Sequence, residues 1–268
     1  MIHRAGKAIA VAALAATLAF SPGKAAAPAA KVISAIDLAV PFGTRSPWRF
    51  TATQGLPEYF EIDGTIPGAV TLCLRRAGDT ACSSAMASMA PLPDPGYAVA
   101  WRPHYLNYAR VAYPRGRAAP PLLLAQTASM YSGDGDQAIY TQLLAYRSAA
   151  DRFEAIFTFV TGHNNNQEVR FIDAGPLKGD VVVAEPTANA PFGYWVTVRR
   201  LDAAYRYRTV LRYRSATLYG DGNPMPVIDS EMPDIHRRLG LWRPEQPLPL
   251  PAGGCAKPRL EKRELWCS

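Results

Sequence analysis

The chain has 268 residues, of which 49% are hydrophobic and 19% are charged. This composition excludes a globally disordered chain and supplies enough apolar side chains for a sizeable core. The formal net charge is +7, and it falls to about +4 once Arg4, Lys7 and Lys24 leave with the N-terminal leader described next. The densest basic run, residues 206–214, interleaves arginine with tyrosine in a strand-like pattern. We therefore expect a solvated sheet face there and no nucleic-acid partner.

Residues 1–27 have the order of segments found in a secretory signal peptide. A basic start is followed by an uninterrupted apolar run, residues 8–20, and then by a proline and small residues. The apolar run is shorter than the roughly 20 residues that a membrane-spanning helix needs. We predict cleavage between residues 25 and 30, a periplasmic or secreted protein, and a single domain over residues 28–268. No later stretch predicts a membrane span.

Four cysteines remain after the leader: Cys73, Cys82, Cys255 and Cys267. An even number of cysteines in an exported chain indicates disulfides, and four cysteines allow three pairings. Local pairing, Cys73 with Cys82 and Cys255 with Cys267, is the simplest and would close the C-terminal tail over residues 255–267. No C-x-x-C pair is present, which argues against zinc binding and thioredoxin-like chemistry.

Short β-prone runs follow from residue 48 onward, separated by segments rich in turn-forming residues. Such separators are typical of strands joined by tight connections. We predict strands in residues 48–52, 69–75, 97–102, 121–130, 138–147, 152–160, 168–172, 180–185, 194–201 and 207–216. Residues 28–45 show no strong period and are expected to be a lead-in segment.

The predicted fold is all-β, an antiparallel meander that closes as a barrel or sandwich, or forms a few irregular propeller-like blades. Both faces of residues 152–160 are largely apolar, which predicts a central strand. One short helix is expected near the C-terminus over residues 232–242, with Asp234 as its N-cap and Gly240 at its end. The proline-rich segment that follows is expected to pack along the surface in an extended form.

The most polar stretch is the run His163, Asn164, Asn165, Asn166 and Gln167, which lies between two predicted strands. Asparagine tolerates the left-handed backbone of tight turns, so the run could be a hairpin turn alone. Amides also present a donor and an acceptor on one planar group, which suits sugars and peptide backbones. Because the run is longer than a turn needs, we predict ligand contact there as well.

Calcium is the one cofactor that the sequence suggests. Asp134 and Asp136 are two residues apart in a glycine-containing turn, and carboxylates at this spacing supply some of the oxygens that calcium needs. The same residues fit a plain hairpin turn. No glycine-rich phosphate loop between a strand and a helix is present, so no nucleotide cofactor is expected.

Carboxylates are concentrated near the C-terminal helix, among them Asp229 and Glu231, and Glu168 precedes them in the polar stretch. Neighbouring carboxylates raise one another's pKa, and a raised pKa is what general acid catalysis needs. A glycosidase-like envelope hydrolase using Asp229, Glu231 and Glu168 is therefore one interpretation. The other is a structural network with Arg237 and Arg238.

No motif of nucleophilic or zinc-dependent catalysis is present, because neither G-x-S-x-G nor H-E-x-x-H occurs. The main prediction is therefore an exported, soluble binding or interaction protein of the bacterial envelope without catalytic activity. Its partner would be another exported protein or a cell-wall glycan. The hydrolase, and a structural domain with a calcium-stiffened loop, are the alternatives.

Overall fold

The computed structural model describes residues 30–61, 64–87, 102–131, 137–162, 166–189, 192–251 and 254–267. Three antiparallel sheets dominate it, and each is built from strands that are close in the sequence. The first sheet has the order β1-β2-β5, with bounds β1 (Lys31–Asp37), β2 (Trp48–Gln54) and β5 (Val70–Arg76). Between β1 and β2 lies α1 (Ala39–Phe42), and β3 (Glu58–Phe60) pairs with β4 (Gly64–Ile66) as a separate ribbon.

The second and third sheets are four-stranded meanders whose spatial order equals their sequence order. The second contains β6 (Tyr105–Ala112), β7 (Leu122–Ala128), β8 (Ile139–Arg147) and β9 (Arg152–Thr161), with the short η1 (Ser148–Ala150) before β9. The third contains β10 (Glu168–Phe171), β11 (Val181–Pro186), β12 (Gly193–Leu201) and β13 (Tyr207–Leu218). The helix α2 (Val227–Arg238) and the hairpin β14 (Arg259–Glu261)–β15 (Glu264–Trp266) complete the described chain.

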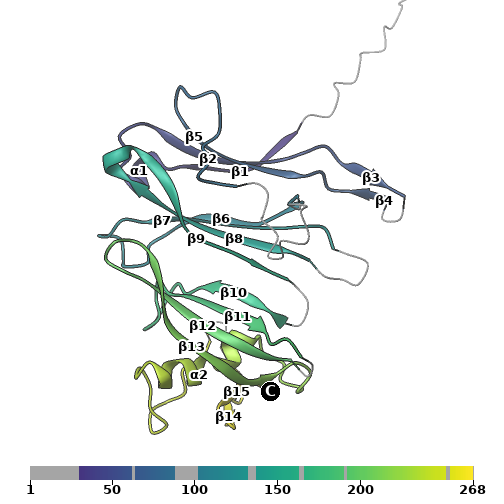
Figure 1. Cartoon of the computed structure of the whole chain (residues 1–268), viewed down its shortest axis with the longest axis vertical. Coiled ribbons are helices and arrows are strands. Elements are labelled where there is room, and N and C mark those ends of the chain that lie inside the picture. The colour runs from purple at the N-terminus through teal and green to yellow at the C-terminus, as the bar shows by residue number, and fades with distance from the viewer. Residues whose placement is uncertain are drawn as a thin grey trace, which may run out of the picture.

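The sheets are stacked as layers, with α2 and the hairpin beyond the third sheet (Figure 1). The alternation of side chains along the strands explains the stacking. Leu123 and Leu144 belong to the core shared with the first sheet, whereas Leu122 and Leu143 belong to the core shared with the third sheet. In β11 the same alternation continues toward the core beneath α2. Successive residues point to opposite faces of a strand, so a continuous apolar run fills two cores at once.

The predicted all-β fold with antiparallel meanders and one short helix near the C-terminus is confirmed. The sheets stay open and do not close into a barrel, so their stacking is that of a sandwich. The solvated face predicted for residues 206–214 is also found, because Arg208, Arg212 and Arg214 are exposed along the edge strand β13 and Arg206 is exposed just before it.

Two strand predictions were wrong. The lead-in segment contains β1 and α1, which the sequence concealed because β1 is largely exposed and therefore lacks an alternating pattern of apolar residues. The strand β9 lies at the edge of its sheet and not at its centre. Its two faces are apolar because neighbouring layers cover them, as Phe153 in the first core and Phe157 in the second core illustrate. The predicted strand over residues 97–102 falls on residues outside the description, except Arg102, which is not in a strand.

The C-terminal helix begins five residues earlier than predicted and contains Pro233 in its interior. Asp234 is not its N-cap, because it lies in the second half of the helix with its side chain turned to two arginines. Gly240 does follow the helix end in a left-handed conformation with φ of 70°. Its N–H donates to the Arg237 carbonyl, as expected where a glycine follows a helix.

Both predicted disulfides are present, Cys73 with Cys82 and Cys255 with Cys267. The first joins β5 to the loop that follows it, and the second closes the tail around the β14–β15 hairpin. The predicted leader, residues 1–27, lies outside the described residues. In the described part of the chain, no helix is both long enough and apolar enough to cross a bilayer.

Candidate functional site

The predicted polar run is only partly described. Asn166 and Gln167 are placed in the β9–β10 connection, whereas His163, Asn164 and Asn165 lie outside the described residues. The predicted calcium ligands Asp134 and Asp136 lie outside them too. Within the described ranges no group of three or more His, Cys, Asp or Glu side chains could hold a metal ion.

One hollow collects amide side chains from three parts of the chain, and we call it the amide depression. It has a volume of about 470 Å³. The β9–β10 connection supplies Asn166 and Gln167, β7 supplies Gln126, and the segment between β13 and α2 supplies Asn223. Its other lining residues are Ile139, Thr161, Glu168, Val169, Pro224, Met225 and Pro226. Because each amide carries a donor and an acceptor, the depression suits an uncharged ligand rich in hydroxyl or amide groups.

Existing hydrogen bonds hold these amides in place. Gln126 accepts from Asn107 at 2.9 Å and donates to Thr141 at 2.9 Å. The Asn223 amide donates to Ser230 at 2.8 Å. Such bonds fix the side-chain positions before any ligand arrives, which reduces the entropy lost on binding.

Asn166 both lies in the turn and lines the amide depression. Its φ of 53° lies in the left-handed region that asparagine tolerates, so it serves the turn. Its exposed side chain also lines the amide depression and is hydrogen-bonded to the hydroxyl of Tyr194. Burial raises the pKa of Tyr194 to about 12, so this hydroxyl is protonated at neutral pH.

The Thr161 hydroxyl lies in the lining of the amide depression and is buried. Thr161 ends β9, is 3% exposed, and its Oγ1 has no hydrogen-bond partner among the described residues. A buried hydroxyl without a partner costs about 1–3 kcal/mol. This unmet hydrogen-bonding capacity points to a ligand or an ordered water beside the amides.

A second hollow, of about 370 Å³, adjoins the amide depression and shares Asn166, Asn223 and Met225 with it. Tyr219 is 46% exposed and lines this second hollow, where its ring meets Phe192 edge-on with ring centres 6.4 Å apart. An aromatic face beside amide groups matches the alternating apolar faces and hydroxyl edges of a sugar ring.

Glu168, Arg170 and Asp229 form an ion-pair network at the border of the amide depression. The Arg170 guanidinium donates to Glu168 at 2.8 Å and also to Asp229. The other Glu168 oxygen accepts from the Ile228 N–H at 2.6 Å. Burial raises the pKa of the Glu168 carboxyl, and Arg170 and the Ile228 N–H offset this only in part. Glu168 lines the amide depression, whereas Asp229 lines a separate groove that Arg170 also lines.

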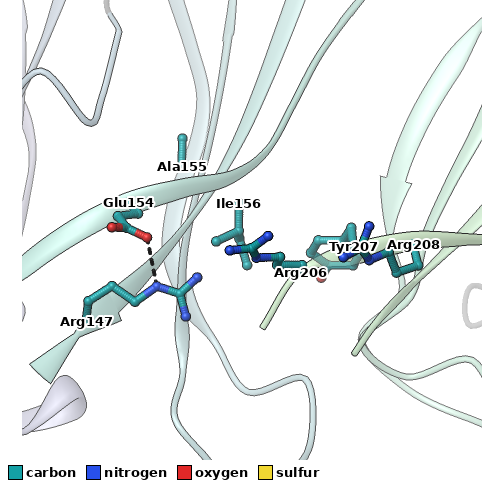
Figure 2. Close-up of a pocket in the computed structure, with 7 residues that line it drawn as sticks. All are labelled: Arg147, Glu154, Ala155, Ile156, Arg206, Tyr207 and Arg208. Carbon is teal, nitrogen blue, oxygen red and sulfur yellow. Dashed lines mark hydrogen bonds and ion pairs between the residues drawn. The ribbon is translucent and has the colours of Figure 1, made fainter. Parts of the chain in front are cut away.

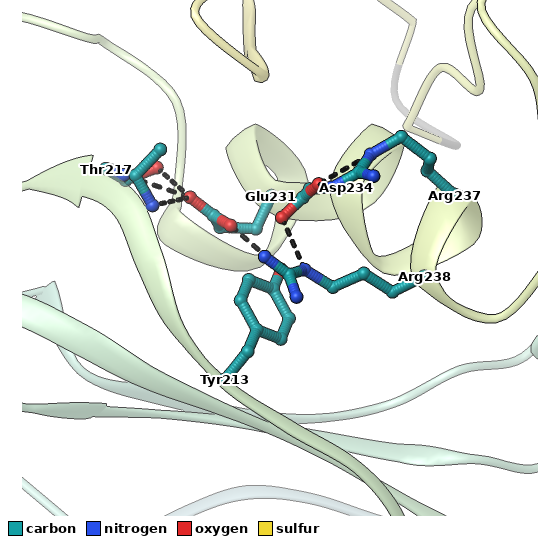
Figure 3. Close-up of polar contacts among 7 residues, drawn as sticks. Tyr213, Thr217, Glu231, Asp234, Arg237 and Arg238 are labelled. Carbon is teal, nitrogen blue, oxygen red and sulfur yellow. Dashed lines mark hydrogen bonds and ion pairs between the residues drawn. The ribbon is translucent and has the colours of Figure 1, made fainter.

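Glu231 has a different environment, which Figure 3 shows. It is 0% exposed, and its carboxylate accepts from the Tyr213 hydroxyl at 2.8 Å. The Thr217 hydroxyl donates to it at 2.7 Å, and the N–H groups of Thr217 and Ala216 donate at 3.0 and 3.1 Å. A carboxylate offers about four acceptor sites, so these donors use its capacity and tie α2 to β13.

Asp234 is the acid of the predicted acid–arginine network. Its carboxylate accepts from Arg237 at 2.9 Å and from Arg238 at 2.7 Å, and the Arg238 guanidinium lies 4.1 Å from the centre of the Tyr213 ring (Figure 3). Burial acts to raise the pKa of Asp234, but the hydrogen bonds from the two arginines outweigh it and the pKa is lowered.

The exposed arginines of the β12–β13 region face a further cleft, of about 400 Å³, between β9 and β13 (Figure 2). Arg206 and Arg208 come from one side of it, and Arg147 and Glu154 from the other. Arg147 is paired with Glu154 at 2.9 Å and Arg208 with Asp202 at 3.2 Å. These pairs satisfy most of the charge, as a solvated surface network does.

No protein-family model matches the chain, and no curated protein and no solved structure matches it. Asn166, Gln167 and Glu168 were candidates from the sequence and line the amide depression, and Gln126, Thr161 and Asn223 line it without having been candidates. Gln126 lies in β7 and Asn223 follows β13, and only the stacking of the sheets brings these two to the β9–β10 connection, whereas Thr161 ends β9 directly before it. A polar residue inside an apolar strand, such as Gln126 in β7, was the one signal that the sequence offered.

Proposed function

We propose that the chain is an exported, non-catalytic binding protein of the bacterial envelope that holds a cell-wall glycan in the amide depression. The observation that carries this proposal is the convergence of Gln126, Asn166, Gln167 and Asn223 beside the Thr161 hydroxyl, which has no partner within the described ranges. Export is supported by the order of segments in residues 1–27 and by the two disulfides, which persist in oxidising compartments.

A glycan accounts for the chemistry of the amide depression better than a charged ligand does. Its amides are neutral, and the Glu168 carboxylate at its border is paired with Arg170. The adjoining exposed ring of Tyr219 adds an apolar face for a sugar ring. An exported protein is the other predicted partner, because amides also bind peptide groups.

Hydrolysis by paired carboxylates has less support. That chemistry needs two carboxyl groups at roughly 5 or 6.5–9.5 Å on either side of the bond to be broken. Glu168 and Asp229 instead meet at one guanidinium and line different hollows. The acceptor capacity of Glu231 is used by Tyr213, Ala216 and Thr217.

The test is a thermal unfolding screen of the oxidised protein, residues 28–268, against soluble peptidoglycan fragments. A ligand at a hundredfold its dissociation constant adds about 2.7 kcal/mol, which raises the Tm of a chain of this size by roughly 5–10 °C. The variant Asn166→Gly removes the amide and keeps the left-handed backbone without strain, so it should abolish most of the shift.

Asn189→Ala is the matched control, because Asn189 is an exposed asparagine that lines none of the hollows described above. A shift that persists in Asn189→Ala and is lost in Asn166→Gly supports the proposal. An unchanged Tm with every fragment overturns it. Crosslinking of the intact protein in the periplasm would then test an exported protein as the partner.

A further inference from the structure

The largest hollow described here is a groove of about 610 Å³ between the β10–β11 connection, α2 and the proline-rich segment. We call it the tail groove. Its lining is mainly apolar and includes Phe171, Pro176, Met232, Trp242 and Leu250. A concave, mostly apolar site with few polar groups, and of this volume, is what small-molecule sites in proteins share.

The outer wall of the tail groove is preformed. The Trp242 indole N–H points to the carbonyls of Gln246 and Pro247, at 3.3 and 2.9 Å, and so folds the proline-rich segment back toward α2. Pro249 and Pro251 also line the groove, and proline fixes the backbone φ. A wall that is already ordered loses little entropy when a ligand binds.

His236 is the distinctive polar group of the tail groove. It is 8% exposed and lines the groove, and its imidazole makes no hydrogen bond to any described residue. Burial lowers the pKa of His236, so the ring is neutral at neutral pH and carries one donor and one acceptor. A ligand with a hydroxyl or amide group could therefore take the place of water at the His236 imidazole, which lines the groove.

The charges around the tail groove disfavour an anion. Arg170 is the one cation that lines it, and Glu168 and Asp229 already neutralise that cation. Asp173 also lines the groove and is paired with Arg110 at 2.7 Å. Within the described residues, the lining therefore offers no free positive charge to a carboxylate or phosphate.

We propose that the tail groove binds a small neutral amphiphile, with an aliphatic or aromatic body along the apolar wall and one hydroxyl or amide group hydrogen-bonded to His236. This site is separate from the amide depression, and its occupant is of a different chemical class from a glycan. The glycan experiment and the amphiphile experiment therefore succeed or fail independently.

The test uses N-phenyl-1-naphthylamine, a neutral aromatic amine whose fluorescence rises in apolar sites, as the probe of the intact oxidised protein. We expect saturable binding at one site. Octanamide and octanoate share one chain length and differ in charge, so octanamide should displace the probe at a concentration at least tenfold lower.

Three variants locate the site. Leu250→Asp places a charge in the groove wall at a side chain that is 46% exposed and should abolish probe binding without unfolding the protein. Leu260→Asp is the matched control, because Leu260 is 42% exposed and lies in β14, outside the groove. His236→Phe keeps an aromatic ring and should weaken octanamide about two- to tenfold, the value of one hydrogen bond, with less effect on the probe.

The proposal is overturned if the probe does not bind saturably, or if Leu250→Asp and Leu260→Asp bind it equally well. It is also overturned if octanoate competes as well as octanamide, since the groove would then accept an anion. Equal competition by octanamide in wild type and His236→Phe would remove the role of His236 and with it the proposed chemistry.

Discussion

Two clusters of polar residues lie next to α2 and differ in how their hydrogen-bonding capacity is used. In the cluster around Glu231, four donors from three residues of β13 saturate a fully buried carboxylate. In the cluster around Arg170, Glu168 borders the amide depression and Asp229 borders the tail groove. The Thr161 hydroxyl, which has no hydrogen-bond partner among the described residues, and the His236 imidazole, which lines the tail groove, lie beside this second cluster.

The difference separates acids that hold the fold together from acids that border a proposed binding site. Glu231 and Glu168 are both glutamates close to the same helix, but only Glu168 lies beside a hollow with unmet hydrogen bonds. Saturated buried networks fix one fold, whereas partly unsatisfied ones need an explanation such as a ligand. Stability and binding should therefore respond to different substitutions in the two clusters.

Glu231→Ala should have the largest effect on stability. It leaves the donors of Tyr213, Ala216 and Thr217 buried without an acceptor. Because each such group costs about 1–3 kcal/mol and neighbouring costs are not additive, we expect a loss of about 3–5 kcal/mol in the free energy of unfolding. Urea denaturation at pH 7 measures it.

Glu231→Gln is the graded control for that measurement. It keeps one carbonyl acceptor but turns an N–H₂ group toward existing donors. Its free energy of unfolding should therefore fall by less than that of Glu231→Ala. A loss below about 1 kcal/mol for Glu231→Ala would show that the cluster is not structural. The distinction between the two clusters would then fail.

Most of the fold could be predicted from the sequence because alternation and turn residues are local signals. The meander from β7 to β13 was visible, since each run is apolar or alternating and each separator carries turn chemistry. The strand β1 was not visible, because an exposed edge strand has no apolar period. The position of β9 at an edge was missed because the layers above and below it, and not neighbouring strands, cover its two faces.

The candidate site could be predicted only where its residues are contiguous. Asn166 and Gln167 were found because the amide run is local in sequence. The placement of Gln126 and Asn223 beside this run depends on how the sheets stack, which no short pattern encodes. The roles of the acids were equally hidden, because the sequence does not say that Glu231 meets β13 while Glu168 meets Arg170.

The pH dependence of stability should have opposite signs at two acids. One is Glu168, in the cluster around Arg170, and the other is Asp234, which pairs with Arg237 and Arg238. The pKa of Glu168 is raised from 4.5 in the folded protein, so its contribution is fully present below the unfolded pKa and is lost as pH rises through the folded pKa. The pKa of Asp234 is lowered from 3.8, so its contribution is present above that value and is lost as pH falls through the folded pKa.

Two variants isolate these contributions in urea denaturation between pH 3 and 8. Asp234→Asn weakens the bonds to Arg237 and Arg238 and should lower the free energy of unfolding by about 2 kcal/mol at pH 7. This loss should shrink toward pH 3. Glu168→Gln should change stability by about 1 kcal/mol or less, and should become more stable relative to wild type as pH rises. The comparison with wild type cancels His236, whose lowered pKa acts in the opposite direction. Parallel pH profiles for Glu168→Gln and wild type would contradict the raised pKa.

The smallest expected effect comes from Thr161→Val, and it is the sharpest test of the amide depression. Valine keeps the β-branched shape and removes only the hydroxyl, which has no partner among the described residues. Stability should stay unchanged or rise by up to about 1 kcal/mol.

The same substitution at Thr217 removes a hydroxyl that bonds Glu231 at 2.7 Å, and it should cost about 1.5–3 kcal/mol. Equal losses at both positions would mean that the Thr161 hydroxyl is satisfied in the free protein, and the amide depression would then have no unmet donor to offer a ligand.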